Sequence, residues 1–160
     1  MSQFFVRARN VASRTRSGEL LPGKQLSHTV AVRKNDATFQ PIVGVVFDTG
    51  AQHTVIPAAV ADKYGIPYSK DGSLAVDLKG ATGKAVGYAG QATLRIHGLP
   101  GWEFEVPCLF VEGAERMLLG LPDQLRNFDF KSLLGGEGPD PMAAGVLYSL
   151  RADHAGRSVQ

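Results

Sequence analysis

The chain has 160 residues, of which 44% are hydrophobic, and this suffices for one domain of ordinary size with a buried core. The 17 Lys and Arg residues nearly balance the 15 Asp and Glu residues, so the net charge of +2 gives no overall field that would favour nucleic acid or a membrane surface. No apolar run approaches the ~18 residues of a membrane span, and no apolar core of a signal peptide is present, so a cytoplasmic protein without a membrane partner is expected.

The first 24 residues differ from the rest of the chain in charge. One acidic residue, Glu19, faces five basic residues, Arg7, Arg9, Arg14, Arg16 and Lys24. This composition is typical of a solvated, loosely ordered segment, and a phosphate-binding tail is the weaker alternative. We therefore expect residues 1–24 to form a basic, flexible N-terminal arm, and nucleic acid is not the expected partner.

Residues 26–130 show the apolar and polar alternation of β-strands. Strands are predicted at 27–33 (SHTVAVR), 41–48 (PIVGVVFD), 91–97 (QATLRIH) and 102–110 (WEFEVPCLF). The strand at 41–48 is apolar on both faces and should be buried on both. In the last two strands we expect Ala92, Leu94 and Ile96 to face the core, and Glu103 and Glu105 to face away from it.

Two short helices are predicted among the strands. Residues 57–65 (PAAVADKYG) begin with Pro57, which suits a first helical turn, and end at Gly65, a residue type that commonly closes helices. Residues 121–128 (LPDQLRNF) carry Pro122 near their start. The pattern predicts an all-β fold with one or two short helices, as a small barrel or sandwich.

The end of the chain has a different composition. Residues 135–145 are rich in Gly and Pro, a strand is possible at 146–152, and the tail after Ala152 is expected to be disordered. The predicted organisation is therefore an arm at 1–24, a folded domain at 25–134, and a linker with a C-terminal extension at 135–160.

The stretch VVFDTGAQHTVIP, residues 45–57, places a carboxylate between two apolar segments. Asp and Gly are common in surface turns, so a structural turn is one interpretation. The apolar flanks argue for the other, because an aspartate between two core segments is costly unless it is partnered or used chemically. We interpret Asp48 as a candidate catalytic residue.

Three elements in chain order resemble the retropepsin-like aspartic proteases of the non-viral type. FDTGAQHTVIP is similar to the active-site loop of that family, MLLG (117–120) to its hydrophobic-hydrophobic-Gly motif, and VDLKGATGKAVGYAG (76–90) to its flap hairpin. The resemblance implies a small closed barrel of the retropepsin-like type and an aspartic endopeptidase. Two departures are visible: Leu121-Pro122 replaces the basic residue that viral members carry after the motif, and Gln52-His53 replaces an acidic pair.

The resemblance assigns roles to individual residues. Asp48 is the catalytic carboxylate, and Thr49, Gly50 and Ala51 support it. Residues expected to bind substrate in the flap and pockets are Gln52, His53, Val55, Gly80, Ala81, Thr82, Gly83 and Leu118. Because Ala51 has no hydroxyl that could lower the pKa of the carboxylate, we predict a pH optimum in the weakly acidic range.

The Asp-Thr-Gly motif occurs once, and the sequence has no internal repeat. Aspartic protease chemistry needs two carboxylates that share a proton. The simplest resolution is a homodimer in which each chain contributes one Asp48 and extended peptide is the substrate. A catalytically inactive dimerisation or peptide-binding module is the alternative, and the basic arm could also be a pro-segment that the enzyme removes itself.

Other chemistries lack support in the sequence. GATGKA (80–85) fails the phosphate-loop pattern because Leu78 stands at the first glycine position and Ala85 at the Ser/Thr position. The four histidines have no metal-ligand spacing, so neither a metal nor a cofactor is expected. Cys108 is interpreted as a buried small apolar residue.

Overall fold

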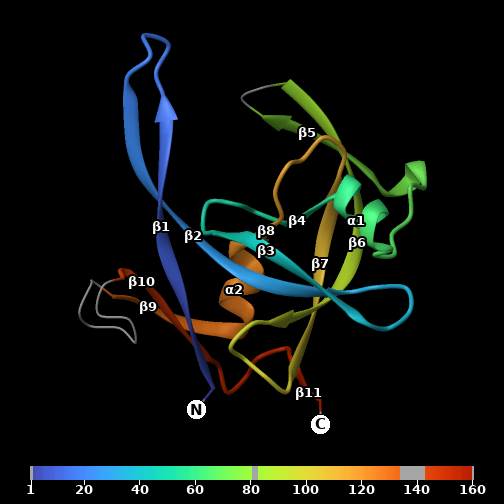
Figure 1. Cartoon of the computed structure of the whole chain (residues 1–160). Coiled ribbons are helices and arrows are strands. Elements are labelled where there is room, and N and C mark those ends of the chain that lie inside the picture. Colours follow the sequence, from blue (N-terminus) through green and yellow to red (C-terminus); the bar gives the residue numbers. More distant parts are fainter. Residues whose placement is uncertain (1, 81–82, 134–142, 160) are drawn as a thin grey trace.

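The computed structural model describes residues 2–80, 83–133 and 143–159 (Figure 1). The strands are β1 (Gln3–Arg14), β2 (Leu20–Arg33), β3 (Phe39–Asp48), β4 (Thr54–Pro57), β5 (Ala75–Gly80), β6 (Gly83–Ile96), β7 (Trp102–Val111), β8 (Leu118–Gly120), β9 (Phe128–Leu133), β10 (Gly145–Leu150) and β11 (Arg157–Ser158). Two helices, α1 (Ala58–Tyr64) and α2 (Leu121–Asn127), and a 3-10 turn, η1 (Gly72–Leu74), complete the described chain. The mostly-β fold with two short helices is confirmed.

The strands hydrogen-bond in the order β5-β6-β7-β4-β8-β3-β2-β1-β10-β9, and β6 also pairs with β2 while β11 pairs with β7. Most neighbours are antiparallel. The exceptions are β3 with β8 and β4 with β7, which are parallel. Because β8 lies between β3 and β4, the segment that follows β7 passes between the two strands that flank the Asp-Thr-Gly loop.

The predicted helix ends are confirmed. Pro57 is the N-cap of α1, and Gly65 closes the helix with φ 69°, a left-handed conformation that glycine adopts without strain. Pro122 lies in the first turn of α2, where its missing N–H costs no helical hydrogen bond.

The hydrophobic core includes residues from nearly the whole length of the chain, from Phe4 to Tyr148. Ala92, Leu94 and Ile96 are buried as predicted. The rings of Phe4 and Tyr148 stack with 5.0 Å between centroids, and Phe128 packs edge-on against Phe4 at 5.2 Å. These contacts join the first strand, the end of α2 and the strand near the C-terminus.

The N-terminal segment is not the flexible arm that its charge predicted. Strand β1 lies between β2 and β10, and Phe4 and Val6 are buried in the core. Pairing of residues 3–7 with β10 and burial of Phe4 and Val6 at alternate positions hold the start of the segment in the sheet. Removal of residues 1–24 would take out this strand, which argues against a self-removed pro-segment.

The strand predicted at 146–152 is confirmed as β10 (Gly145–Leu150), whereas the tail after Ala152, expected to be disordered, contains the short strand β11. β10 pairs with both β1 and β9, and Tyr148 is fully buried. Further on, β11 pairs with Trp102 and Glu103 of β7. The predicted division at 25–134 therefore places essential strands outside the domain, because the pairing partners of these segments are remote in sequence.

Two burial predictions are wrong for reasons visible in the structure. The strand at 41–48 was expected to be buried on both faces, but Val43 in the first half of β3 is 83% exposed. Within β3, the buried residues are the three consecutive residues Val45, Val46 and Phe47 near its end. Glu103, expected on the exposed face, is 6% exposed, because the C-terminal segment covers that face.

Glu103 is stabilised by two guanidinium groups. Arg95 Nη2 lies 2.6 Å from Glu103 Oε1, and Arg157 Nη2 lies 2.8 Å from Oε2. The hydrogen bond from Arg157, and to a smaller extent the one from Arg95, holds the pKa of this carboxyl below its usual value against the opposing effect of burial.

Within the described ranges, no helix is both long enough and apolar enough to cross a membrane.

Candidate active site

Asp48 is the last residue of β3 and lies directly beside the hydrophobic-hydrophobic-Gly motif. The parallel pairing of β3 with β8 sets Val46 opposite Leu118, Phe47 opposite Leu119 and Asp48 opposite Gly120. Phe47 is 2% exposed, whereas Asp48 is half-buried. The strand is thus anchored in the core, and it delivers the carboxylate to the surface at its end.

The chain turns sharply after Asp48, and the turn orients the carboxylate. The backbone N–H of Gly50 donates to Asp48 Oδ1 at 2.9 Å, and the N–H of Ala51 donates to the Asp48 carbonyl at 3.2 Å. The N–H of Leu121 donates to the Ala51 carbonyl at 3.0 Å, which ties the loop to the start of α2. One carboxylate oxygen therefore has a fixed backbone donor, and the hydrogen bonds described for the loop leave Oδ2 open to chemistry.

Gly120 allows β8 to approach the loop closely. A Cβ at this position would lie 2.5 Å from the carbonyl carbon of His53 and 2.8 Å from the backbone N of Thr54. Both are main-chain atoms, so no side chain could move aside to make room. The glycine of the motif is thus required by packing against the residues that follow the Asp-Thr-Gly turn.

A buried polar cluster lies behind the loop, and it was not predicted from the sequence. Thr54 is fully buried; its hydroxyl donates to Asp123 Oδ2 at 2.5 Å and accepts from the Gly120 N–H at 3.0 Å. Asp123 is 3% exposed, and burial raises the pKa of its carboxyl, an effect opposed by the Thr54 hydrogen bond and by the charges of Arg126 and His53. One threonine hydroxyl thereby joins the loop, β8 and α2.

The cluster continues into the core through α2. Gln124 Nε2 donates to the Leu119 carbonyl at 2.9 Å, and the Tyr148 hydroxyl donates to Gln124 Oε1 at 2.7 Å. Asn127 Nδ2 donates to the Asp123 carbonyl at 2.9 Å. The motif that supports Asp48 is therefore bonded to β10 through buried side chains. A signal was present in the sequence only for Thr54, a polar residue directly before the apolar Val55-Ile56-Pro57.

The structure brings together only some of the residues predicted to bind substrate. Val55 pairs with Leu118, and both are half-buried beside the loop. Thr49, Gln52 and His53 are exposed on the loop itself.

The predicted flap is a β-hairpin in the structure. β5 pairs with β6 from Ala75 opposite Tyr88 to Gly80 opposite Gly83, and this hairpin lies at the upper right of Figure 1. The remaining two predicted flap residues, Ala81 and Thr82, lie outside the described residues. The pairing of the two described strands is that of a hairpin, as the sequence predicted.

Cys108 is buried, as predicted. Burial, with a smaller contribution from the charge of Asp123, raises the pKa of its thiol to about 12. A thiol with this pKa is not a nucleophile near neutral pH.

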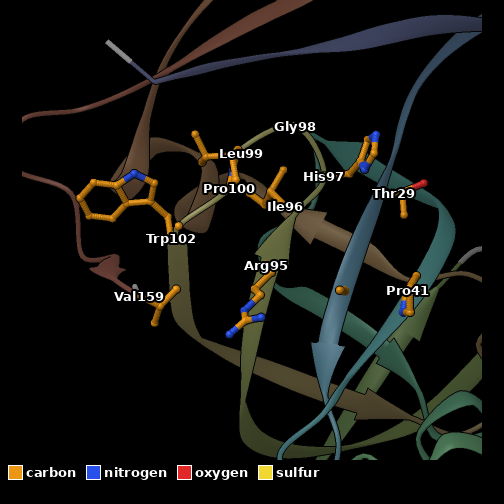
Figure 2. Close-up of a pocket in the computed structure, with 12 residues that line it drawn as sticks. Thr29, Pro41, Arg95, Ile96, His97, Gly98, Leu99, Pro100, Trp102 and Val159 are labelled. Carbon is orange, nitrogen blue, oxygen red and sulfur yellow. The ribbon is translucent and has the colours of Figure 1, made fainter.

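Two cavities of the described chain lie away from Asp48. One of about 670 Å³ is lined by Arg95, His97, Leu99, Trp102 and other residues around the β6–β7 connection (Figure 2). The other, of about 1110 Å³, lies between the β1–β2 hairpin and the start of β3. A single chain thus presents the candidate carboxylate on its surface and not inside either of these cavities.

The family of the chain is shown by a match to a family model. A family model described as "gag-polyprotein putative aspartyl protease" matches residues 30–125, which is more than half of the chain. Among solved structures, the chain is similar to the crystal structure of a retropepsin-like aspartic protease from Rickettsia conorii, with 16% sequence identity, coverage of 92% of this chain and 98% of that one, and a TM-score of 0.43. No curated protein gave a significant match.

The matched range contains the Asp-Thr-Gly loop, the β5–β6 hairpin and the Leu-Leu-Gly motif, which are the three elements that carried the resemblance in the sequence. The chain belongs to the retropepsin-like aspartyl protease family that this model represents.

Proposed function

We propose that this protein is an aspartic endopeptidase whose catalytic dyad forms from Asp48 of two identical chains. The observation that carries the proposal is the geometry at the end of β3: a half-buried carboxylate on a rigid strand, with one oxygen bonded to the Gly50 N–H and the β8 glycine packed behind its loop. Membership of the family supports peptide hydrolysis as the reaction.

The proposed mechanism uses two carboxylates that share one proton. The ionised Asp48 of one chain takes a proton from a water molecule, and the oxygen of that water attacks the carbonyl carbon of the peptide bond. The protonated Asp48 of the other chain donates a hydrogen bond to the carbonyl oxygen and stabilises the tetrahedral intermediate. Proton transfer to the amide nitrogen then releases the amine without a covalent enzyme intermediate. The two carboxylates share one proton in the resting state because like charges this close cannot both be ionised.

The proposed dimer also completes the substrate site. Each chain would contribute Val55 and Leu118 as pocket walls, the Thr49 hydroxyl as a tie between the two loops, and the β5–β6 hairpin as a flap over the peptide. An extended substrate would pair its backbone with these strands and place alternate side chains in the pockets. The strand order supports a closed barrel in each chain, because β6 pairs with β2 as well as with β7. Hairpin opening would admit the substrate.

The deciding experiment compares the wild type with Asp48→Asn. Both are incubated with a pool of unfolded proteins at several pH values, and new peptides are identified by mass spectrometry. We expect internal cleavages that the variant lacks, while circular dichroism shows that both are folded. Equal peptide patterns from the two proteins would contradict the protease proposal and favour the alternative, an inactive dimerisation or peptide-binding module with this fold.

A further inference from the structure

The β1–β2 hairpin projects beyond the rest of the described chain (Figure 1). Strand β1 pairs with β10 only as far as Arg7, and β2 pairs with β3 only from Ser27 onward. Between these limits, residues 8–26 form a two-stranded ribbon in which β1 pairs with β2 alone, from Ala8 opposite Leu26 to Arg14 opposite Leu20. At about 3.3 Å per residue, the ribbon extends on the order of 20 Å from the sheet.

The ribbon leaves the sheet at the level of the candidate active site. Ser27 of β2 is paired with Val46 of β3, two residues before Asp48. Because the strands are antiparallel, the continuation of β2 from Leu26 back to Leu20 runs past Asp48 in the direction in which β3 points. This direction leads out of the chain beyond the Asp-Thr-Gly loop, which is the side from which a second Asp48 must approach.

Beyond its base, neither face of the ribbon is covered by the described part of its own chain. Every residue from 9 to 24 that lies in the two strands is exposed. The hydrogen bonds described for residues 9–24 join residues of the ribbon to one another. Three of the exposed residues are large and apolar: Leu20 and Leu21 are each 62% exposed, and Val11 is 37% exposed.

A two-stranded ribbon without a packed face is marginally stable in water, and the two leucines at its far end are placed where a partner would bury them. The groove of about 1110 Å³ lies at its base, lined by Arg9 and Val11 of the ribbon and by Val43 and Glu115 of the body. Val43, at 83%, is the most exposed of the large apolar side chains described for this protein. An occupant of the groove would cover apolar surface on both of its walls.

Charge limits how two ribbons can be arranged. Arg9, Arg14, Arg16 and Lys24 face one acidic residue, Glu19, in this segment. Two such ribbons laid side by side would repel each other at low ionic strength. The favourable arrangement sets each ribbon against the body of the other chain.

We infer that the ribbon, residues 8–26, is a dimerisation arm that grips the second copy of this chain and holds the two Asp48 loops together. The inference rests on the proposed function, because it is the requirement for a second Asp48 that identifies the partner as another copy. It assigns to this arm the stabilising role that a basic residue after the Leu-Leu-Gly motif cannot supply here, since Leu121 occupies that position.

Two variants of the full chain test the arm. In the first, Leu20→Glu is combined with Leu21→Glu, which places charge at its apolar end. In the second, residues 10–24 are replaced by Asn-Gly, a two-residue turn that suits the paired Arg9 and Gln25. The matched control is Leu125→Glu, which charges a leucine of α2 that is 48% exposed and outside the ribbon.

Sedimentation equilibrium over a range of protein concentrations gives the dimer Kd of each protein, and circular dichroism checks that each is folded. We expect the dimer Kd to rise by about tenfold or more in both ribbon variants, the size of effect that follows loss of a central apolar contact in an interface. In the control, the Kd should change by less than about twofold. Activity per chain should fall in the ribbon variants at low concentration and recover at high concentration.

The outcomes separate the arm from the protease proposal. A wild-type dimer whose Kd is unchanged in both ribbon variants overturns the arm and leaves the dimeric protease standing. A ribbon variant that dimerises normally but loses binding to a labelled single-stranded RNA also overturns it, in favour of a nucleic-acid arm. A wild type that stays monomeric and inactive at all concentrations overturns both proposals.

Discussion

The hydroxyl of Thr54 is the most informative single group to remove. Thr54→Val keeps the size and branching of a fully buried side chain but deletes its two hydrogen bonds, one to Asp123 Oδ2 and one from the Gly120 N–H. Asp123 Oδ1 has no hydrogen-bond partner in the described structure, and Arg126 Nη1 lies 3.9 Å from it. The variant would therefore leave a buried carboxylate without any close donor.

The expected cost follows from these contacts. A hydrogen bond to a charged group contributes about 1.5–3 kcal/mol, and an unsatisfied buried N–H at Gly120 costs about 1–3 kcal/mol more. The two are coupled through one oxygen, so we expect a loss of about 3–5 kcal/mol in the free energy of unfolding at pH 7. For a chain of this length, the melting temperature should fall by roughly 10 °C.

The loss should depend on pH. Burial raises the pKa of Asp123, so the folded protein binds this proton where the unfolded chain has released it. The contribution of Asp123 to stability is thus present below the unfolded pKa and is lost as pH rises through the folded pKa. Deleting the Thr54 hydroxyl raises the folded pKa further. The difference between wild type and variant should therefore be smaller near pH 4, where a larger share of Asp123 is protonated, than at pH 7.

Urea unfolding at both pH values measures the difference, and Thr93→Val is the control. Thr93 is a half-buried strand residue with no described side-chain hydrogen bond, so its variant should lie within about 0.5 kcal/mol of the wild type. A Thr54→Val loss below about 1 kcal/mol, or one that does not change with pH, would refute the assigned role of the hydroxyl.

Three further variants test other parts of the structure. Ala51→Ser should shift the pH optimum of the proposed activity toward acid, because a hydroxyl beside the carboxylate can stabilise its charged form; a wild-type optimum below about pH 3 would contradict the weak-acid prediction. Gly120→Ala should cost about 1–3 kcal/mol or more in urea unfolding, since its Cβ would meet main-chain atoms of His53. Glu103→Gln should lower the melting temperature by several degrees at pH 7 and by less near pH 3. The lowered pKa of Glu103 stabilises the fold above the usual carboxyl pKa, and this contribution is lost as pH falls through the pKa of the folded state. An equal loss at both pH values would contradict the ion pairs.

Features set by neighbours in sequence could be predicted from the sequence. Ala92, Leu94 and Ile96 alternate with polar residues, and the ends of α1 follow from the backbone preferences of Pro57 and Gly65. Each of these features depends on local sterics or on the two-residue period of a strand, and both can be read from one segment of sequence without knowledge of its neighbours in space.

Features set by remote contacts could not be predicted in this way. Phe4 and Val6 stand in a segment dominated by arginines, and their burial depends on pairing with β10 across most of the chain length. Glu103 is buried because Arg157 approaches from the C-terminal segment. No local pattern contains such pairings, and composition misleads wherever a few apolar residues decide the position of a charged segment.

The candidate site shows both cases. Asp48 is predicted as the catalytic residue from its apolar flanks and from the resemblance of its loop to the family, and the structure places it, half-buried, at the end of β3. The link between Thr54 and Asp123 joins residues far apart in the chain, and it exists only because β8 passes between β3 and β4. The sequence therefore predicts the residue that would do the chemistry more readily than the residues that hold its loop in place.

Mixing wild type with Asp48→Asn separates a shared active site from one that is complete within a chain. If each active dimer needs two Asp48 carboxylates and chains assort at random, a threefold excess of the variant should reduce the activity of a fixed amount of wild type to about one quarter, because most wild-type chains then pair with an inactive one. A site contained in one chain would keep its full activity. Repeating the mixture with the ribbon-shortened form of Asp48→Asn should relieve the inhibition, since a chain without the arm competes poorly for partners. Full activity in the first mixture would mean that Asp48 acts without a second copy, and the half-site geometry at the end of β3 would then need a different chemistry.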